Sequence, residues 1–350
     1  MYNRNLALVN LSNDDIKDII HKIKYVKVGI IGDACLDIYW EADMILSELS
    51  RETPHFPLPV TGERMSLGAG GNVAANVNDL KVKETYILTV IGGDWRGREL
   101  MSLLEDWNIS DEYVIKLSDR LTPAYCKPLR KGISDIVYED PRIDFENRVS
   151  IDNSDEDLII DRLDHMIKKI DVLLVADQLN HGIITNRVRQ KLCNIYREGI
   201  PVIADSRNRI QLFKNIIIKP NEFEAVASIY GDIHAREIDE KFILDIIQRH
   251  YSNIKQPVII TMGLNGSLWY DGKKIVKAKS YPVKPPIDTV GAGDCFMAAF
   301  GSAFGAGIPG DKAVAFGNLA SSVSIGKIGT TGTATPKEIL KRFKEVEELG

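Results

Sequence analysis

The sequence predicts an α/β fold built on a mostly parallel β-sheet with helices on its faces. Six short segments are almost uniformly apolar, as expected of strands buried on both sides: 27–33, 86–93, 171–177, 200–205, 215–220 and 257–263. Helical patterns lie between most of these segments, and such alternation is typical of a parallel sheet. Several segments end in Asp or Gly, which suits a site at the carboxyl ends of the strands.

Helices are predicted where apolar residues recur every three or four positions. The segments with this pattern are 12–24, 72–81, 96–107, 155–169, 186–197, 236–250, 311–325 and 336–348. A further, buried helix begins near Asp294, because Phe296, Phe300 and Phe304 share one face and little in the helix is polar. It ends before Pro309, since proline cannot continue a helix.

Two segments interrupt the alternation of strands and helices. Residues 36–67 are long, marked by prolines and poor in helical pattern, and residues 121–149 alternate apolar and polar positions like antiparallel strands. The two segments are therefore predicted to pair into a small β-sheet that stands over the strand ends as a lid. The alternative is a pair of surface loops, which the sequence does not exclude.

Composition limits the classes of function. The chain has 350 residues, of which 44% are hydrophobic and 27% charged, with a net charge of −5, as in ordinary globular proteins. This charge argues against a general nucleic-acid or anionic-membrane surface, and no apolar run approaches the roughly 18 residues of a membrane span. The N-terminus lacks a secretion signal and the four cysteines are scattered, so we expect a cytoplasmic protein with reduced thiols.

The stretch DTVGAGD (288–294) carries the strongest chemical signal. The backbone of Gly291, Ala292 and Gly293 can turn several N–H groups outward at the start of a helix, which makes an anion site. A carboxylate there, Asp294, conflicts with a bound anion unless it acts as a base on the group that attacks the anion. The alternative is a glycine turn with Asp294 as an ordinary N-cap, and these residues alone leave both interpretations open.

Two further motifs place polar side chains near the first strand. GDACLD (32–37) puts Asp37 just past the strand, and SLGAGGN (66–72) puts Gly71 and Asn72 at the start of a helix. The side chains of Asp37 and Asn72 can hold sugar hydroxyls, at a place where ligands bind in such sheets. A turn residue and an N-cap are the alternatives.

A third motif, KPNEFEA (219–225), follows a buried strand. Asn221 and Glu224 are three residues apart and share one face if a helix starts there. Hard oxygen ligands at a strand end suit Mg²⁺ held largely through water and phosphates. The same spacing is the signature of a capping box, so the two interpretations remain open.

The order of these motifs resembles the PfkB, or ribokinase-like, sugar kinases over residues 27–340. The resemblance rests on GDACLD, the GAGGN turn, NEFE, TMG (261–263) and, above all, DTVGAGD. It implies a ribokinase-like α/β fold in which a central, mostly parallel sheet is flanked by helices and covered by a small β-sheet lid. It also implies an N-terminal helical extension at 1–26 and a kinase domain at 27–350, with the lid in segments 36–67 and 121–149.

The resemblance implies a site that transfers a phosphoryl group from ATP to a sugar hydroxyl. Asp294 would take the proton from that hydroxyl, the amides of 291–293 would hold the phosphoryl group, and Asp37, Gly71 and Asn72 would bind the sugar. The residues implied at the nucleotide and its Mg²⁺ are Asn221, Glu224, Thr261, Gly263 and Asn318. Asp288 with GTTG (329–332) resembles the family's loop for a monovalent cation such as K⁺.

Within the family, the sequence is most similar to bacterial heptose-7-phosphate 1-kinases. The matching stretches are LDIYW (36–40), the PLPV ending near 60, RIDFEN (142–147), KPNEFEAV (219–226) and SIGKIGTTGTATP (324–336). The resemblance therefore implies conversion of heptose 7-phosphate to heptose 1,7-bisphosphate, with Arg142 at the substrate phosphate. Two stretches depart from the pattern: SELSRETPHFPLPV is longer, and DQLNHG (177–182) lacks the usual lysine.

Two other functions remain as alternatives. One is a kinase for a different sugar or a nucleoside, and the other is a non-catalytic sugar or nucleotide sensor on the same scaffold. A sensor is disfavoured because Asp294 and both glycines of the anion turn are present, and a Rossmann dehydrogenase because no GxGxxG follows the first strand. The partners expected are a sugar or sugar phosphate, ATP and a second copy of the chain that pairs through the apolar face of the lid.

Overall fold

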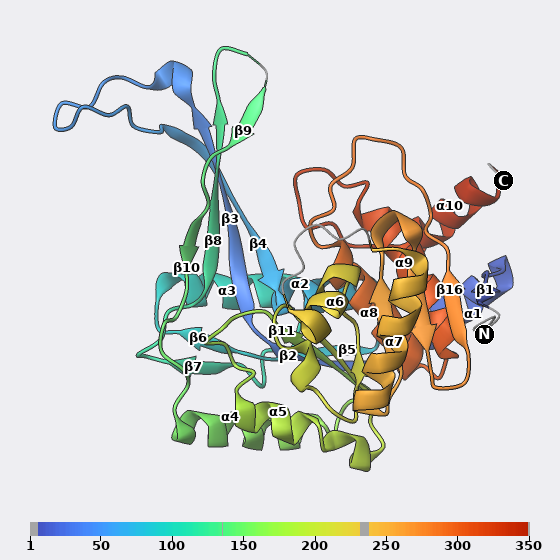
Figure 1. Cartoon of the computed structure of the whole chain (residues 1–350). Coiled ribbons are helices and arrows are strands. Elements are labelled where there is room, and N and C mark those ends of the chain that lie inside the picture. Colours follow the sequence, from blue (N-terminus) through green and yellow to red (C-terminus); the bar gives the residue numbers. More distant parts are fainter. Residues whose placement is uncertain (1–5, 135, 232–237, 349–350) are drawn as a thin grey trace.

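The computed structural model describes residues 6–134, 136–231 and 238–348, and a nine-stranded sheet forms its centre (Figure 1). The strand order is β1-β16-β15-β14-β13-β12-β11-β2-β5, and only β15 runs antiparallel to its neighbours. The predicted strands are β2 (Lys27–Gly32), β5 (Glu84–Leu88), β11 (Val172–Asp177), β12 (Val202–Ser206), β13 (Ile217–Ile218) and β14 (Val258–Thr261). The predicted α/β class and mainly parallel sheet are confirmed.

Three strands at one edge of this sheet were not predicted. They are β15 (Ser267–Tyr270), β16 (Ile275–Ala278) and β1 (Ala7–Val9). β15 and β16 form an antiparallel hairpin of four-residue strands, which is too short to give a clear alternation. β1 pairs in parallel with β16, and α1 (Asn13–Ile23) packs against two helices of the body, α8 (Ala292–Gly305) and α10 (Pro336–Glu347). The division of the chain into an extension at 1–26 and a kinase domain at 27–350 stays a prediction.

Helices cover both faces of the sheet. One layer packs its apolar residues with α8 (Ala292–Gly305) at the centre; its other members are α1, α2 (Gly70–Asp79), α3 (Trp95–Asp106), α9 (Gly310–Ser324) and α10 (Pro336–Glu347). The opposite layer contains α4 (Asn153–Met166), α5 (Asn186–Leu192), α6 (Glu222–Tyr230) and α7 (Glu240–Ile254). Each layer buries a continuous apolar core against the sheet, which fixes the strand ends in place.

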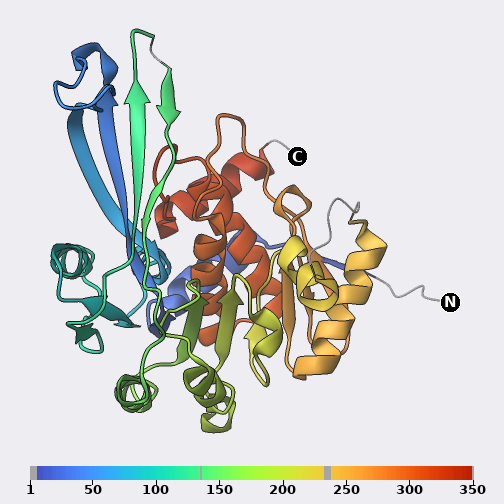
Figure 2. The same cartoon turned by 60° about the vertical axis from the view of Figure 1, so that its left-hand side comes forward.

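The predicted lid exists as a separate five-stranded sheet. Its strands are β3 (Ala34–Asp43), β4 (Val60–Ala69), β8 (Ala124–Lys131), β9 (Val137–Glu139) and β10 (Ile143–Phe145). β3 lies between β4, which is antiparallel to it, and β8, which is parallel to it, so the two predicted segments pair directly. Figures 1 and 2 show this sheet standing away from the body, and the surface-loop alternative is therefore wrong.

The outer part of the lid exposes many apolar side chains. Near its tip the residues that are more than 40% exposed are Ile45, Leu46, Leu49, Phe56, Leu58, Val60, Ile133, Ile136, Val137 and Tyr138, and Ile143 is exposed closer to the base, where it pairs with Cys126. The base of the lid differs, because Leu36, Ile38 and Ala124 are fully buried against the body. The lid is thus anchored at one end and presents an apolar face at the other.

A few predicted elements differ in detail. The strand predicted at 86–93 divides into β5 and β6 (Val90–Gly92), and β6 pairs with β7 (Ile115–Leu117) in a separate two-stranded sheet. The helix predicted at 186–197 ends at Leu192 and is followed by a 3₁₀ turn. The first two residues of the helix predicted at 236–250 lie outside the described residues. Within the described ranges, every helix is too short or too polar to cross a lipid bilayer.

Candidate active site

A polar cavity of about 390 Å³ lies at the carboxyl ends of the central strands, between the body and the lid. This volume is within the range of small-molecule sites. The cavity collects side chains from segments far apart in the sequence. Its lining includes Asp37, Asn72, Tyr125, Lys127, Arg142, Gln178, Asp205, Arg207, Lys219, Asn221, Glu224, Thr261, Gly291, Gly293, Asp294 and Thr331.

The N-terminus of α8 forms the inner end of the cavity. Gly291 is its N-cap and has a φ of 79°, in the left-handed region that favours glycine. A Cβ at Gly291 would lie 3.0 Å from the Asn72 Nδ2 atom, so a side chain there would crowd the site as well. The positive end of a buried helix thus faces the cavity through Gly291 and Gly293, as an anion site requires, whereas the Ala292 N–H donates to the Thr289 carbonyl at 3.2 Å.

Asp294 lies in the first turn of α8 and lines the cavity. Burial raises its pKa to about 6, because desolvation disfavours the charged carboxylate more than its neighbours stabilise it. We expected the helix terminus to keep this carboxylate ionised. A pKa near 6 still leaves it mostly ionised at neutral pH, and it lies in the range suited to a general base.

Asn72 and Asp294 meet across the cavity. The Asn72 Nδ2 atom donates a hydrogen bond of 2.7 Å to the Asp294 Oδ2 atom, and this bond lowers the Asp294 pKa against the effect of burial. Asn76, one turn later on α2, donates to the Asn72 side-chain and backbone oxygens. The Asn72 side chain is therefore oriented from behind, and α2 has no side-chain cap at its start, so the N-cap alternative for Asn72 is wrong.

Asp37 lies on β3, at the base of the lid. It is 94% buried, and its Oδ2 atom lies 3.4 Å from the Lys127 Nζ atom on the adjacent strand β8. Lys127 also donates to the Tyr39 hydroxyl at 3.1 Å. Burial raises the pKa of Asp37, although the charge of Lys127 opposes this. Asp37 is thus a cavity residue held by the lid and not a simple turn residue.

Asn221 and Glu224 form a capping box at the start of α6. The Asn221 side chain accepts a hydrogen bond from the Glu224 N–H at 2.8 Å, and one Glu224 oxygen accepts from the Asn221 N–H at 2.8 Å. Both residues also line the cavity, so the cap and the site coincide. Thr261 lies beside them, because it bridges in parallel to Asn221.

Lys219 was missed as a site residue. It is 97% buried at the cavity and lies 2.9 Å from the Asp205 Oδ2 atom. Burial lowers the pKa of a lysine, but the charges of Asp205 and Glu224 outweigh it and raise the Lys219 pKa, so the ammonium stays charged. The signal was a lysine in KPNEFEA directly after a buried strand, where such a charge must find a partner.

Other predicted residues lie elsewhere. Gly263, Asn318 and Asp288 do not line this cavity, and neither do Gly71 and Ala292. Asn318 is tied to the β15–β16 hairpin, because its side chain donates to the carbonyls of residues 278 and 279 and accepts from Ser267. Asp288 accepts hydrogen bonds from the N–H groups of Val290 and Gly329, which joins it to the 329–332 loop.

Four of the cationic side chains in the predicted lid segments separate into two pairs: Arg51, Lys127, Arg130 and Arg142. Arg142 and Lys127 line the cavity, whereas Arg51 and Arg130 do not. Arg142 makes a bidentate ion pair with Asp144, at 2.6 and 2.7 Å, and its guanidinium lies 4.2 Å from the centre of the Tyr125 ring. Its charge is therefore largely compensated by Asp144.

Sequence comparison identifies the family. A family model described as pfkB family carbohydrate kinase matches residues 35–338. The chain belongs to the pfkB family. It is therefore a carbohydrate kinase, a phosphotransferase that uses an alcohol group as acceptor, and pfkB kinases use ATP with Mg²⁺.

Curated relatives of this pfkB kinase include two bacterial proteins of the same name. The bifunctional protein HldE of a Nitratiruptor species is 28% identical over 317 residues, which cover 89% of this chain and 64% of the relative. The bifunctional protein HldE of Aliarcobacter butzleri is 27% identical over 346 residues, covering 93% and 69%. The chain thus spans about two thirds of the length of these relatives.

Solved structures of pfkB-type kinases share the fold. Arabidopsis thaliana ribokinase complexed with ribose and ATP aligns with a TM-score of 0.69 and 21% identity, covering 91% of this chain and 99% of that chain. Phosphofructokinase-2 from Escherichia coli in complex with potassium aligns with a TM-score of 0.73 and 21% identity, covering 92% and 99%. At such identities the likeness concerns the ribokinase-like fold alone.

Proposed function

We propose that the protein transfers the γ-phosphoryl group of ATP to the anomeric hydroxyl of heptose 7-phosphate, which gives heptose 1,7-bisphosphate. The observation that carries the proposal is the pairing of Asp294 with the amides at the N-terminus of α8, in one cavity with Asp37 and Asn72. The substrate follows from the motifs that resemble heptose-7-phosphate 1-kinases.

Asp294 is proposed as the general base. Its pKa near 6 allows it to accept the proton of the attacking hydroxyl at neutral pH, and Asn72 orients its carboxylate. The amides at residues 291–293 would stabilise charge on the phosphoryl group during transfer. Phosphoryl transfer depends mainly on positioning and charge stabilisation, so one base and a set of fixed donors suffice.

The residues present fit a magnesium–nucleotide complex. Glu224 uses one carboxylate oxygen in the helix cap, and it lies in the cavity with Asn221 and Asp205. Among the described residues, no cluster of three His, Cys, Asp or Glu side chains could hold a metal ion, and we propose that Mg²⁺ is held by few carboxylates, largely through water and phosphates. When bound, Mg²⁺ would neutralise phosphate charge, and Lys219, which pairs with Asp205, is a cation of the protein itself in the same cavity.

For the remaining residues we keep the predicted roles as proposals. Thr261, Gly263 and Asn318 would border the nucleotide, and Asp288 with residues 329–332 would form the loop for a monovalent cation. Asp37 and Asn72, together with Gly71, would hold sugar hydroxyls, and Arg142 would contribute from the lid to the substrate phosphate.

A second candidate is a pfkB kinase for another sugar or for a nucleoside. It is favoured by the departures at DQLNHG and at residues 47–60, and by identities below 30% to the curated relatives. ADP release by the purified protein, measured over a panel of sugars, sugar phosphates and nucleosides, separates the two. The highest kcat/KM should belong to heptose 7-phosphate. A higher value for an unphosphorylated sugar or a nucleoside would replace the substrate proposal.

We propose that two copies pair through the lid. The apolar residues exposed on the outer lid are left in water by a single copy, and two-fold pairing of like surfaces is the commonest way to cover them. Phosphofructokinase-2 from Escherichia coli has been described in a tetrameric inhibited form, so a kinase of this fold does assemble. Light scattering should give twice the chain mass, and Val137→Asp should give a single chain mass.

A further inference from the structure

The loop at residues 178–184, which follows β11, reaches the cavity through Gln178 and is fixed by charged groups on both sides. The buried Asp33 carboxylate accepts three backbone N–H hydrogen bonds from this loop, at 2.8 to 3.1 Å. Gly182 lies so close to Asp33 that a Cβ would overlap its carboxylate. From the other side, Arg209 donates to the carbonyls of Leu179 and Asn180. The loop backbone is thus ordered before any ligand binds.

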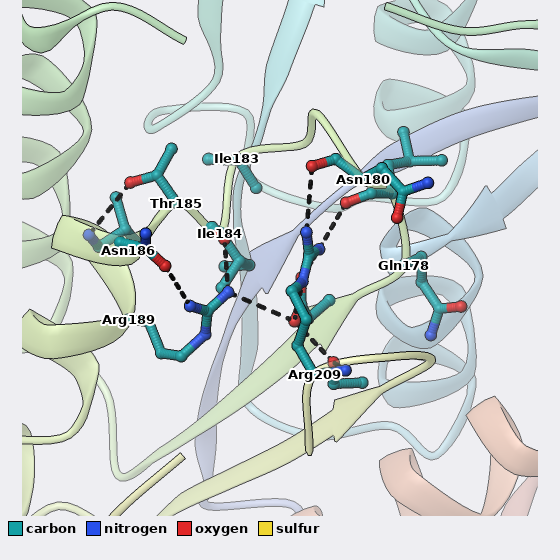
Figure 3. Close-up of polar contacts among 12 residues, drawn as sticks. Gln178, Asn180, Ile183, Ile184, Thr185, Asn186, Arg189 and Arg209 are labelled. Atoms are coloured by element: carbon teal, nitrogen blue, oxygen red, sulfur yellow. Dashed lines mark hydrogen bonds and ion pairs between the residues drawn. The ribbon is translucent and has the colours of Figure 1, made fainter. Parts of the chain in front are cut away.

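A second buried carboxylate, Asp177, connects this loop to the end of β12. Its side chain is fully buried and accepts hydrogen bonds from the Ser206 hydroxyl at 2.6 Å and from Arg209. Figure 3 shows Arg209 and Arg189 approaching the same carboxylate from two sides, with Arg189 at 3.9 Å. Ser206 is buried, and Arg209 is also held by the Asn180 carbonyl. The network therefore fixes the carboxyl ends of β11 and β12 relative to each other.

The network positions two cavity residues that have no role in the site as described so far. Gln178 follows Asp177 directly, and the Arg207 N–H donates to the Asp177 backbone carbonyl at 3.2 Å. Both side chains line the cavity. In Figure 3 the Gln178 side chain points away from the network, and its carboxamide has no hydrogen-bond partner within the described residues.

Arg207 is the uncommitted cation of the cavity. Four cationic side chains line it, and three have carboxylate partners: Lys127 with Asp37, Lys219 with Asp205 and Arg142 with Asp144. In the described part of the chain, no carboxylate lies within 4.0 Å of the Arg207 guanidinium.

Arg207 is an exposed side chain that lines the cavity together with residues of the lid and of the body. Burial raises the pKa values of Tyr125, on the lid, and Glu224, on α6, and the charge of Arg207 opposes both increases. The nucleotide end of the cavity already has Lys219, Glu224 and the α8 amides. The loop at 178–184 contains no lysine or arginine of its own, and Lys127 and Arg142 already face carboxylates. Within the described residues, Arg207 is thus the cavity cation whose charge no carboxylate offsets at close range.

We propose that Arg207 and Gln178 bind the phosphate monoester that the sugar substrate already carries, and that they select phosphorylated sugars. A guanidinium presents two parallel N–H donors that match phosphate oxygens, and the Gln178 carboxamide adds a donor beside it. The inference rests on the proposed function, since it names the group that distinguishes the preferred substrates. Arg207 is thus proposed as the main contact of the substrate phosphate. Arg142 contributes less, because Asp144 already compensates its charge.

Steady-state kinetics of Arg207→Gln test the proposal, with Arg142→Gln measured alongside and Arg98→Gln on the distant α3 as the control. For Arg207→Gln the KM for the sugar phosphate should rise about 10- to 100-fold, as expected for a lost charged hydrogen bond. The KM for ATP, and kcat/KM for an unphosphorylated sugar, should change less than about two-fold. Arg207→Lys should recover part of the loss, because it restores charge without the planar fork.

Three results would overturn the assignment. The first is a loss confined to the KM for ATP, which would place Arg207 at the nucleotide. The second is an equal loss for phosphorylated and unphosphorylated sugars, and the third is a larger loss in Arg142→Gln than in Arg207→Gln.

Calorimetry without ATP separates this proposal from the proposed function, using sedoheptulose 7-phosphate and inorganic phosphate as probes. Wild-type protein should bind the sugar phosphate at least ten-fold more tightly than Arg207→Gln does. This difference in affinity is expected even if the protein transfers phosphate from ATP to none of the sugars in the panel. Equal affinities in the two proteins would contradict the role of Arg207, whatever the turnover.

Discussion

The floor of the cavity, which comprises Asp205, Lys219, Glu224 and Asp294, lies on elements buried in the body, whereas the lid is exposed over most of its outer part. On the floor, charged groups meet at fixed distances across a packed sheet. On the lid, only the base is buried, and the tip offers apolar side chains to water or to a partner. We infer that the packed body carries the transfer chemistry and, through Arg207 and Gln178, the contact with the substrate phosphate, whereas the base of the lid contributes Asp37.

The largest effect is expected at the floor, from Asp294→Asn. The amide cannot accept the proton of the attacking hydroxyl, so turnover should fall roughly ten-thousand-fold, at the upper end of what loss of a general base costs. ATP affinity measured by calorimetry should stay within about two-fold, because the α8 amides and Lys219 are unchanged. A variant that keeps more than about a tenth of wild-type turnover would remove Asp294 from the mechanism.

The base of the lid should show a smaller effect, and in binding. Asp37→Ala removes a proposed hydroxyl partner, so the KM for the sugar should rise by the equivalent of roughly 1.5–3 kcal/mol while the KM for ATP changes little. The experiment compares both KM values by ADP release. A defect seen mainly in melting temperature would instead assign Asp37 to the support of Lys127 and the lid.

Two valines compare the packing of the two regions directly. Val175 on β11 is 0% exposed and Val137 on β9 is 54% exposed. Replacing Val175 with alanine should lower the free energy of unfolding by roughly 2 kcal/mol through lost burial and a cavity, whereas the same change at Val137 should cost under about 0.5 kcal/mol. Urea unfolding of both variants measures this, and equal costs would contradict the contrast.

The smallest expected effect is a shift in pH dependence. Activity requires ionised Asp294, so kcat should be high above about pH 6 and fall as the pH drops through that value. Asn72→Ala removes a hydrogen bond that lowers the Asp294 pKa, so the midpoint should move up. Asp37→Asn removes a negative charge that raises this pKa, so the midpoint should move down. If the midpoint moved in the same direction in both variants, the fall of kcat at low pH would reflect the titration of a group other than Asp294.

The sequence predicted those helices and strands whose apolar pattern is clear along the chain. Strands buried on both faces appear in the sequence as apolar runs, so the central strands were predicted. The stretch around Asp294 reads as a glycine turn followed by an apolar helix, so α8 was predicted as well. The β15–β16 hairpin was missed because four-residue strands carry too little pattern.

The pairings within the site could not be predicted in the same way. Asn72 and Asp294 are 222 positions apart, and Lys219 reaches Asp205 only through the register of the sheet. Arg207 was missed for the same reason. No local pattern distinguishes it from Arg209, two residues later, which points into the Asp177 network.

The central claim is that this pfkB kinase phosphorylates the anomeric hydroxyl of heptose 7-phosphate, and ³¹P NMR of one reaction tests it most directly. With wild-type protein, ATP, Mg²⁺ and the sugar phosphate, the γ-phosphate signal should decline while a new anomeric phosphate signal grows and the original sugar phosphate signal persists. Unchanged ATP, or γ-phosphate that appears only as inorganic phosphate, would contradict the claim.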